Sequence, residues 1–133
     1  MKKYGFTLVE LLAVLAVLGI LMTIIAPSVS HAVKNSRVAA YEKQIQILTT
    51  ATEKWGTEHL GELPDRDSDK LVTVDFRTLY QDGEITSYPL TNPTTGEELE
   101  GCIVISYSAQ YKQYEYKYSD NLTICNNYHY ANN

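Results

Sequence analysis

The sequence holds few of the residues on which catalytic and metal sites depend. It has two cysteines and three histidines among 133 residues, and neither cysteine has the C-x-x-C or Cys/His spacing of a zinc site. The histidines, His31, His59 and His129, are scattered along the chain. No serine lies in a nucleophile elbow, and no glycine-rich phosphate loop is present. The sequence therefore predicts no enzymatic activity, no metal site and no cofactor.

Positive charge is also scarce. The chain has 11 Lys and Arg residues against 16 Asp and Glu residues, which gives a formal net charge of -5. An excess of acids on the surface disfavours general binding to nucleic acid and to anionic lipid. We therefore expect no intrinsic nucleic-acid binding.

One long apolar run is present, and it contains a single acid, Glu10. The run covers residues 6–26 and follows Lys2 and Lys3. About 20 apolar residues are enough to cross a bilayer as one helix. A charge near the bilayer centre costs about 2.5 to 3.5 kcal/mol, so even an acid near the edge indicates a function. The run is too long for the short apolar core of an ordinary secretory signal, and no small-residue cleavage site follows it.

The string KKYGFTLVE at residues 2–10 resembles the class III leader of type IV pilins and type II secretion pseudopilins. In that family a membrane peptidase cuts after the glycine on the cytoplasmic side and methylates the new amino terminus. The resemblance implies cleavage between Gly5 and Phe6, with residues 1–5 removed as a leader and Phe6 becoming N-methylphenylalanine. It also implies that Glu10 pairs with the Phe6 ammonium of the same or a neighbouring subunit in a filament core, where pairing offsets desolvation.

The same resemblance implies a function and a location. The chain would be a structural subunit of a type IV pilus or pilus-like filament, polymerised through its amino-terminal helix. Its partners would be copies of itself, other pilin subunits, the prepilin peptidase/methyltransferase, the assembly platform with its ATPase, and the membrane. The precursor would be a single-pass inner or cell membrane protein. The mature subunit would lie in an extracellular pilus, or in a filament that spans the periplasm or cell wall.

Family members serve in adhesion, twitching motility, DNA uptake and protein secretion, and all four tasks are compatible with this sequence. A second interpretation stays open beside the filament subunit. In it the apolar run is an uncleaved signal anchor, and the exported part is a binding module that presents an acidic, Tyr-rich face. Cleavage after Gly5 distinguishes the two.

The helical pattern continues beyond the apolar run. We predict that residues 6–27 form the transmembrane and filament-core helix and residues 28–60 its amphipathic exported half. Together they would be about 80 Å long at 1.5 Å per residue. Pro27 should bend or locally open the helix, with Gly19 adding freedom, and the similar stretch of family members can melt on assembly. Spacings of three and four residues predict a buried stripe at Tyr41, Gln44, Ile45, Leu48, Ala51, Thr52 and Trp55.

Gly56, Gly61 and Pro64 are expected to end this helix and to open a polar loop. Residues 65–69 alternate acids in the manner of a calcium loop. Lys70, however, stands where such a loop needs glycine, and the position of its bidentate glutamate holds phenylalanine. A solvated acidic turn is the prediction.

Residues 61–133 are predicted as a head with an antiparallel sheet of three to four strands. Period-two alternation marks strands at residues 103–107 and 114–118. An apolar segment at 71–74 precedes a short helix capped by Asp75 and followed by Gly83, and residues 122–124 are expected to add a short strand. The fold class is therefore α+β and type IV pilin-like, with a long amino-terminal helix packed on a small sheet.

The head contains one pair of cysteines and a group of tyrosines. Cys102 and Cys125 are expected to form a disulfide outside the cell, and closing a loop of about 24 residues would stabilise the head by about 3 kcal/mol. Two free buried thiols are the alternative. Seven of the 11 tyrosines lie from Tyr107 onward, and half-buried strand faces are their expected place. Carbohydrate stacking and aromatic electron conduction are the alternatives for these rings.

Overall fold

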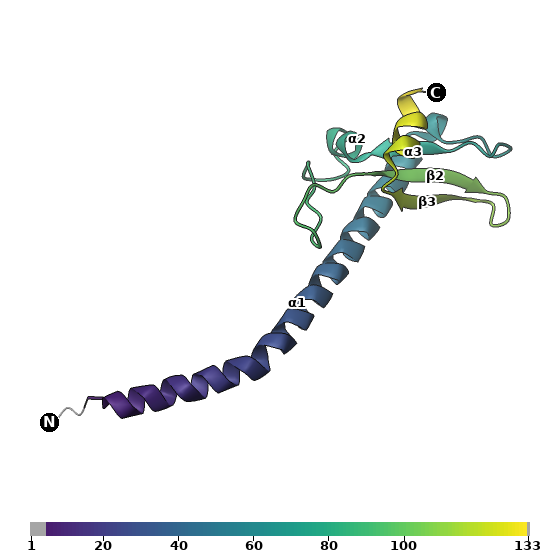
Figure 1. Ribbon diagram of the computed structural model, residues 1–133. Helices are drawn as coiled ribbons and strands as arrows, with labels where there is room; N and C mark the ends of the chain where they lie inside the picture. The colour runs from purple at the N-terminus through teal and green to yellow at the C-terminus, as the bar shows by residue number, and fades with distance from the viewer. Residues whose placement is uncertain (1–4, 133) are drawn as a thin grey trace. The chain divides into compact units, whose positions relative to one another are not determined.

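The computed structural model describes residues 5–132, except for the side chain of the last of them. Lys2 and Lys3 of the leader therefore lie outside the described residues. A long helix, α1 (Leu8–Glu58), comes first and a small α+β head follows (Figure 1). The chain divides into two compact units between Val38 and Ala39, so α1 contributes to both.

The amino-terminal unit consists of the first part of α1. The helix continues through Pro27, so the expected local opening is not present in this structure. Pro27 has no N–H to donate to the carbonyl of Thr23, four residues earlier. The hydroxyl of Thr23 itself donates to the carbonyl of Ile20 at 2.7 Å, which satisfies the polar side chain inside an apolar segment. The helix therefore tolerates both the proline and the threonine.

The head is built on a sheet of three strands within the described residues. They are β1 (Val72–Asp75), β2 (Cys102–Ser108) and β3 (Gln113–Ser119), which are antiparallel and follow the order β1-β2-β3. Ile103 is opposite Val74 on one side and Tyr118 on the other. The strands predicted at residues 103–107 and 114–118 are thus confirmed, and β1 overlaps the apolar segment at 71–74. The α+β class is confirmed as well, with a helix packed on an antiparallel sheet.

The carboxy-terminal part of α1 packs on one face of this sheet. Leu48 and Trp55 are buried together with Ile103 and Ile105 of β2 in a single core cluster. The predicted stripe is confirmed, because Leu48, Ala51, Thr52 and Trp55 are buried and Tyr41 and Ile45 pack against the cluster. Two polar side chains of this stripe have partners. Thr52 donates to the Leu48 carbonyl at 2.8 Å, and the indole N–H of Trp55 donates to Asp82 at 2.8 Å.

Gly56 has a different role from the one predicted. The expectation that it ends the helix is wrong, since α1 continues to Glu58 and Gly56 is buried. A Cβ at Gly56 would lie 2.5 Å from the hydroxyl oxygen of Tyr116 on β3. The missing side chain therefore permits close approach of the Tyr116 ring to the helix.

The opposite face of the sheet is covered at one end by a helix, α3 (Leu122–Asn127). The expected short strand at residues 122–124 is therefore wrong. Asn121 caps this helix, because its side-chain oxygen accepts the amides of Thr123 at 3.0 Å and Ile124 at 3.3 Å. An asparagine cap favours a helical start over an extended segment, and Cys125 is the buried residue of this helix.

Short segments complete the head. Helix α2 (Phe76–Gln81) begins after Asp75, whose carboxylate accepts the amide of Thr78 at 2.8 Å. The predicted cap is thus confirmed, and Gly83 follows the helix with a φ of 78°. One-turn 3-10 helices lie at η1 (Leu60–Glu62) and η2 (Tyr130–Asn132). Thr73 of β1 also forms a parallel bridge with His129, which brings the carboxy-terminal segment to the sheet.

Candidate processing and assembly site

The amino terminus of α1 is closed by a reciprocal pair of hydrogen bonds between Thr7 and Glu10. The amide of Thr7 donates to the Glu10 carboxylate at 3.2 Å, and the amide of Glu10 donates to the Thr7 hydroxyl at 3.3 Å. This is a capping box, in which two otherwise unpaired donors of the first helical turn are satisfied. The carboxylate is also placed at the positive end of the helix dipole.

Thr7 was not among the predicted site residues, although the sequence contains the signal for it. Residues 7–10 read TLVE, which matches the S/T-x-x-E pattern directly before an apolar run. The resemblance implies a partner for Glu10 in assembly, whereas the observed partner lies three residues earlier in the same chain. The structure shows the partner at Thr7.

Phe6 lies just before this cap. Its side chain is 88% exposed, and Gly5 has open space around the position of a Cβ. The Gly5–Phe6 peptide bond therefore lies outside the helix, which begins at Leu8. A peptidase can reach such a bond without unwinding α1.

The helix after the cap presents apolar side chains all round. Every described residue from Gly5 to Ala40 is exposed. An 18-residue window of α1 has a mean hydropathy of 2.8, and none of it is buried. By length and composition, α1 is sufficient to cross a membrane. A helix that is apolar on all sides needs a lipid or protein environment.

The other predicted site residues lie away from the cap. Gly19 and Pro27 are on α1, and a Cβ at Gly19 would meet no neighbouring atom within 4 Å. The glycine is therefore not required by packing within one chain. The structure places Gly5, Phe6 and Glu10 together, and it leaves Gly19 and Pro27 two or more turns farther along the helix.

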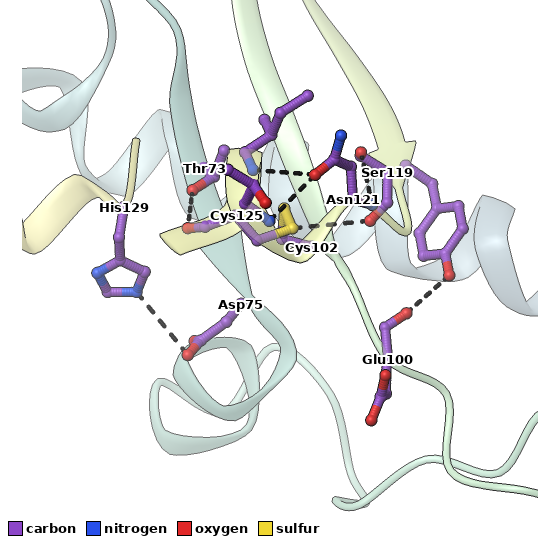
Figure 2. Close-up of a disulfide and its surroundings, with 11 residues drawn as sticks. Thr73, Asp75, Glu100, Cys102, Ser119, Asn121, Cys125 and His129 are labelled. Carbon is purple, nitrogen blue, oxygen red and sulfur yellow. Dashed lines mark hydrogen bonds and ion pairs between the residues drawn. A yellow bond between two sulfur atoms is a disulfide. The ribbon is translucent and has the colours of Figure 1, made fainter. Parts of the chain in front are cut away.

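Cys102 and Cys125 are joined by a disulfide in the head, with sulfur atoms 2.07 Å apart. The bridge attaches α3 to β2, as Figure 2 shows. Next to it, the buried hydroxyl of Thr73 donates to the carbonyl of Cys125 at 2.8 Å. The alternative of two free thiols is not the state of this structure.

Charged groups of the head are paired at its surface. Lys54 on α1 lies 2.9 Å from the Glu84 carboxylate, which holds the pKa of Lys54 above its usual value. On β3, Lys117 lies 2.7 Å from Glu115 and lowers the pKa of that carboxyl. Within the described residues, no group of three or more His, Cys, Asp or Glu side chains is arranged to hold a metal ion.

Comparisons with known proteins bear on the amino-terminal segment. The family model "Prokaryotic N-terminal methylation motif" matches residues 1–26. The chain is 51% identical over 43 residues to "Prepilin peptidase-dependent protein A" of Clostridium perfringens (strain 13 / Type A). That match covers 32% of this chain and 30% of the relative, so the chain spans less than a third of the length of this curated relative. No solved structure matches the chain.

The matched region contains the capping box, the Gly5–Phe6 bond and most of the exposed apolar helix. The head lies outside residues 1–26. The resemblance that residues 2–10 carry is therefore confirmed: this chain has a prepilin-type N-terminal methylation motif.

Proposed function

We propose that this chain is a structural subunit of a type IV pilus or pilus-like filament. In this proposal the prepilin peptidase removes residues 1–5 and methylates Phe6. The observation that supports it best is a carboxylate, Glu10, held at the start of a helix that is apolar and exposed on all sides. Such a helix is unsuited to water as a monomer and suited to a membrane and then to a bundle of copies of itself.

The position of Glu10 supports a role in pairing with the new amino terminus. Its carboxylate accepts the amide of Thr7, the residue that directly follows Phe6. Cleavage after Gly5 would create an ammonium one residue from that amide, close to a carboxylate that is already oriented. In a low-dielectric filament core, pairing of these charges within or between subunits offsets the cost of burying each.

The proposed division of labour follows the length of α1. Residues 6–27 would anchor the precursor in the membrane and later form the filament core, and residues 28–60 would carry the head of residues 61–133 outside. The stretch from Gly19 to Pro27 is helical in this structure. Melting of that stretch during assembly remains part of the proposal, supported by the missing N–H of Pro27 and the open space at Gly19.

The proposed partners are copies of the chain, other pilin subunits, the peptidase/methyltransferase and an assembly platform with its ATPase. No enzymatic role is proposed, because the matched motif is that of structural proteins that the peptidase processes. The mature subunit is placed in an extracellular pilus or in a filament spanning the periplasm or cell wall.

Mass spectrometry of the amino-terminal peptide tests processing and location together. Protein would be taken from sheared surface filaments and, separately, from membranes. We expect a chain that begins at methylated Phe6 in the sheared fraction. The same species confined to membranes would favour a secretion pseudopilin or a minor subunit. An intact chain in both fractions would contradict the proposal and favour the uncleaved anchor with an exported binding module.

Variants of the capping box separate assembly from helix capping. Glu10→Gln keeps an oxygen for the Thr7 amide but loses the charge, whereas Thr7→Ala loses one bond of the box and keeps the carboxylate. We expect Glu10→Gln and Glu10→Ala to insert and be processed normally and to lower filament yield by more than about tenfold, because an unpaired buried charge costs about 3 to 5 kcal/mol. Thr7→Ala should assemble far better than either, since a lost cap costs about 1 kcal/mol.

The opposite ranking would overturn the pairing argument. If Glu10→Gln formed filaments at the native yield while Thr7→Ala did not, the carboxylate would be needed only for the cap. Thr7→Ser is the matched control, because it keeps the hydroxyl that accepts the Glu10 amide and should leave both processing and yield unchanged.

A further inference from the structure

The tyrosines of the β2–β3 hairpin fall into two groups. Tyr116 and Tyr118 are packed against the core, as expected for strand tyrosines. Tyr111, at the turn between the strands, is 64% exposed and is not part of that cluster. Core packing therefore explains the rings of β3 and leaves the ring of Tyr111 without a structural role.

Tyr111 lines an open trough of about 510 Å³ along β3. β3 is the last strand in the sheet order, so its outer edge has no neighbouring strand among the described residues. Glu53 of α1 lines the trough as well. The remaining lining residues come from the hairpin: Gln113, Tyr114, Glu115, Tyr116 and Lys117.

The walls of this trough are held in place by interactions within the head. The hydroxyl of Tyr114 donates to the carbonyl of Pro64 at 3.1 Å. Its ring also makes an edge contact with Tyr107, with centroids 5.2 Å apart. Glu115 is fixed by Lys117 at 2.7 Å. A preorganised wall loses little side-chain freedom when a ligand binds.

The lining combines aromatic rings with hydrogen-bonding groups. Tyrosine rings can stack on the apolar faces of a sugar, and carboxylate, amide and ammonium groups can bond its hydroxyls. Two carboxylates, Glu53 and Glu115, and one cation, Lys117, line the trough, and Lys117 is already paired with Glu115. An anionic ligand would meet net negative charge there, and a purely apolar ligand would leave these polar groups unpaired.

We propose that the trough along β3 is a binding site for a neutral saccharide, with Tyr111 as its exposed stacking platform. This inference goes beyond filament assembly and does not depend on it. The site lies in the head, whereas the processing motif lies at residues 1–26.

Saturation-transfer NMR on the full chain in a zwitterionic detergent without a sugar headgroup tests the proposal. The probes are chitotetraose and cellotetraose as neutral saccharides, 3′-sialyllactose as an anionic one, and tetralysine as a cation. We expect transfer from the protein to a neutral probe. Tyr111→Ala should weaken binding by about tenfold, the size of a stacking contribution, and Tyr111→Phe should retain most of it.

Tyr80→Ala is the matched control, because Tyr80 is 47% exposed and does not line the trough. It should leave binding unchanged. Fluorescence of Trp55, which is fully buried in the head, checks that each variant is folded. A folded native chain that shows no transfer to either neutral probe would overturn the proposal.

Three other results would also contradict it. Tighter binding of the sialylated probe would exclude a site selective for neutral saccharides. Binding of tetralysine that is lost in Glu53→Gln but kept in Tyr111→Ala would identify an electrostatic patch. Equal losses in Tyr111→Ala and Tyr80→Ala would indicate a nonspecific effect of removing surface rings.

Discussion

At the residue scale, Gly101 and Gly83 have positive φ angles of 124° and 78° but different surroundings. A Cβ at Gly101 would collide with the backbone carbonyl of Ser119 on β3, whereas a Cβ at Gly83 would meet nothing within 4 Å. We expect Gly83→Ala to cost about 1 kcal/mol from its backbone conformation alone. Gly101→Ala should cost about 2 to 4 kcal/mol, since a steric clash adds to the same conformational cost.

Urea unfolding of the full chain in detergent, followed by the fluorescence of Trp55, measures both free energies. Gly61→Ala serves as the neutral control, because Gly61 has neither a positive φ nor a neighbouring atom within 4 Å. Equal losses for Gly101→Ala and Gly83→Ala would mean that the chain relieves the clash by moving β3.

The phenol of Tyr118 is expected to make the stability of the head depend on pH. Burial raises the pKa of its phenol to about 12, with a smaller contribution from Tyr41. The hydroxyl donates to the carbonyl of Glu100 at 2.7 Å. Because the pKa in the folded state lies above the ordinary value of 10.0, the neutral phenol stabilises the head. This contribution is complete below pH 10 and is lost as the pH rises toward 12.

A pH series of unfolding measurements checks this expectation. The native head should lose stability between pH 10 and 12, and Tyr118→Phe should lose less over that interval, although it is less stable at neutral pH because the bond to Glu100 is gone. Absorbance of phenolate in the native state should show one late-titrating tyrosine that the variant lacks. An identical alkaline loss in both proteins would assign the effect to other groups.

At the scale of elements, the disulfide fixes α3 to the sheet. The bridge connects residues 23 positions apart, and closing a loop of this length contributes about 3 kcal/mol in the chain-entropy model. We expect Cys102→Ser to lower the thermal midpoint of the head under oxidising conditions and to have little further effect in reductant. An unchanged midpoint under oxidising conditions would mean that the bridge does not stabilise the head.

Thr73→Val tests the contact beside the bridge without breaking it. The substitution keeps the shape of the side chain and removes the bond from the buried hydroxyl to the Cys125 carbonyl. A buried carbonyl without its donor costs about 1 to 3 kcal/mol, so the variant should be less stable in both redox states. A loss seen only in the oxidised protein would indicate that α3 is docked by the disulfide alone.

The elements differ in how far the sequence predicts them. The stripe from Tyr41 to Trp55 and the strands β2 and β3 follow from periodicity, which reports local burial. The segment at residues 122–124 is short and apolar, so its periodicity fits strand and helix equally, and only the cap at Asn121 decides. The packing at Gly56 could not be predicted from local sequence, because Tyr116, which approaches it closely, lies on a strand 60 residues later in the chain.

The amino-terminal site could be predicted from the sequence only as far as it is formed within one chain. Phe6 and Glu10 follow from the motif, and the TLVE pattern contained the capping box in full. The approach of a second subunit involves chemistry that a single chain does not contain. The cap formed by Glu10 is therefore specified by local sequence, whereas the pairing proposed for it depends on a second subunit.

At the scale of the whole molecule, the two units have separate physical requirements. The described residues before Tyr41 are exposed and take no part in the core cluster. Those from Tyr41 onward supply the cluster and the disulfide. The first unit requires a membrane or neighbouring helices, whereas the second contains its own hydrophobic core. For the filament subunit proposed above, this separation would let the head stay folded both in the membrane and in the filament.

This separation predicts that a fragment of residues 28–133 folds alone. It retains the whole stripe of α1, and it should be soluble without detergent because the apolar run is gone. Trp55 is the single tryptophan of the chain, so its fluorescence reports unfolding of the head in both proteins. Measured in the same micellar solution, the fragment and the full chain should agree within about 0.5 kcal/mol, because the removed residues take no part in the core cluster.

A fragment of residues 49–133 is the matched control, since it removes Tyr41, Ile45 and Leu48 from the stripe. Loss of buried Leu48 alone should cost about 2 to 5 kcal/mol, a large part of the stability of a head this small. If the fragment of residues 28–133 instead unfolded at much lower urea than the full chain, the amino-terminal helix would stabilise the head directly. Assembly would then change the stability of the head as well as its position.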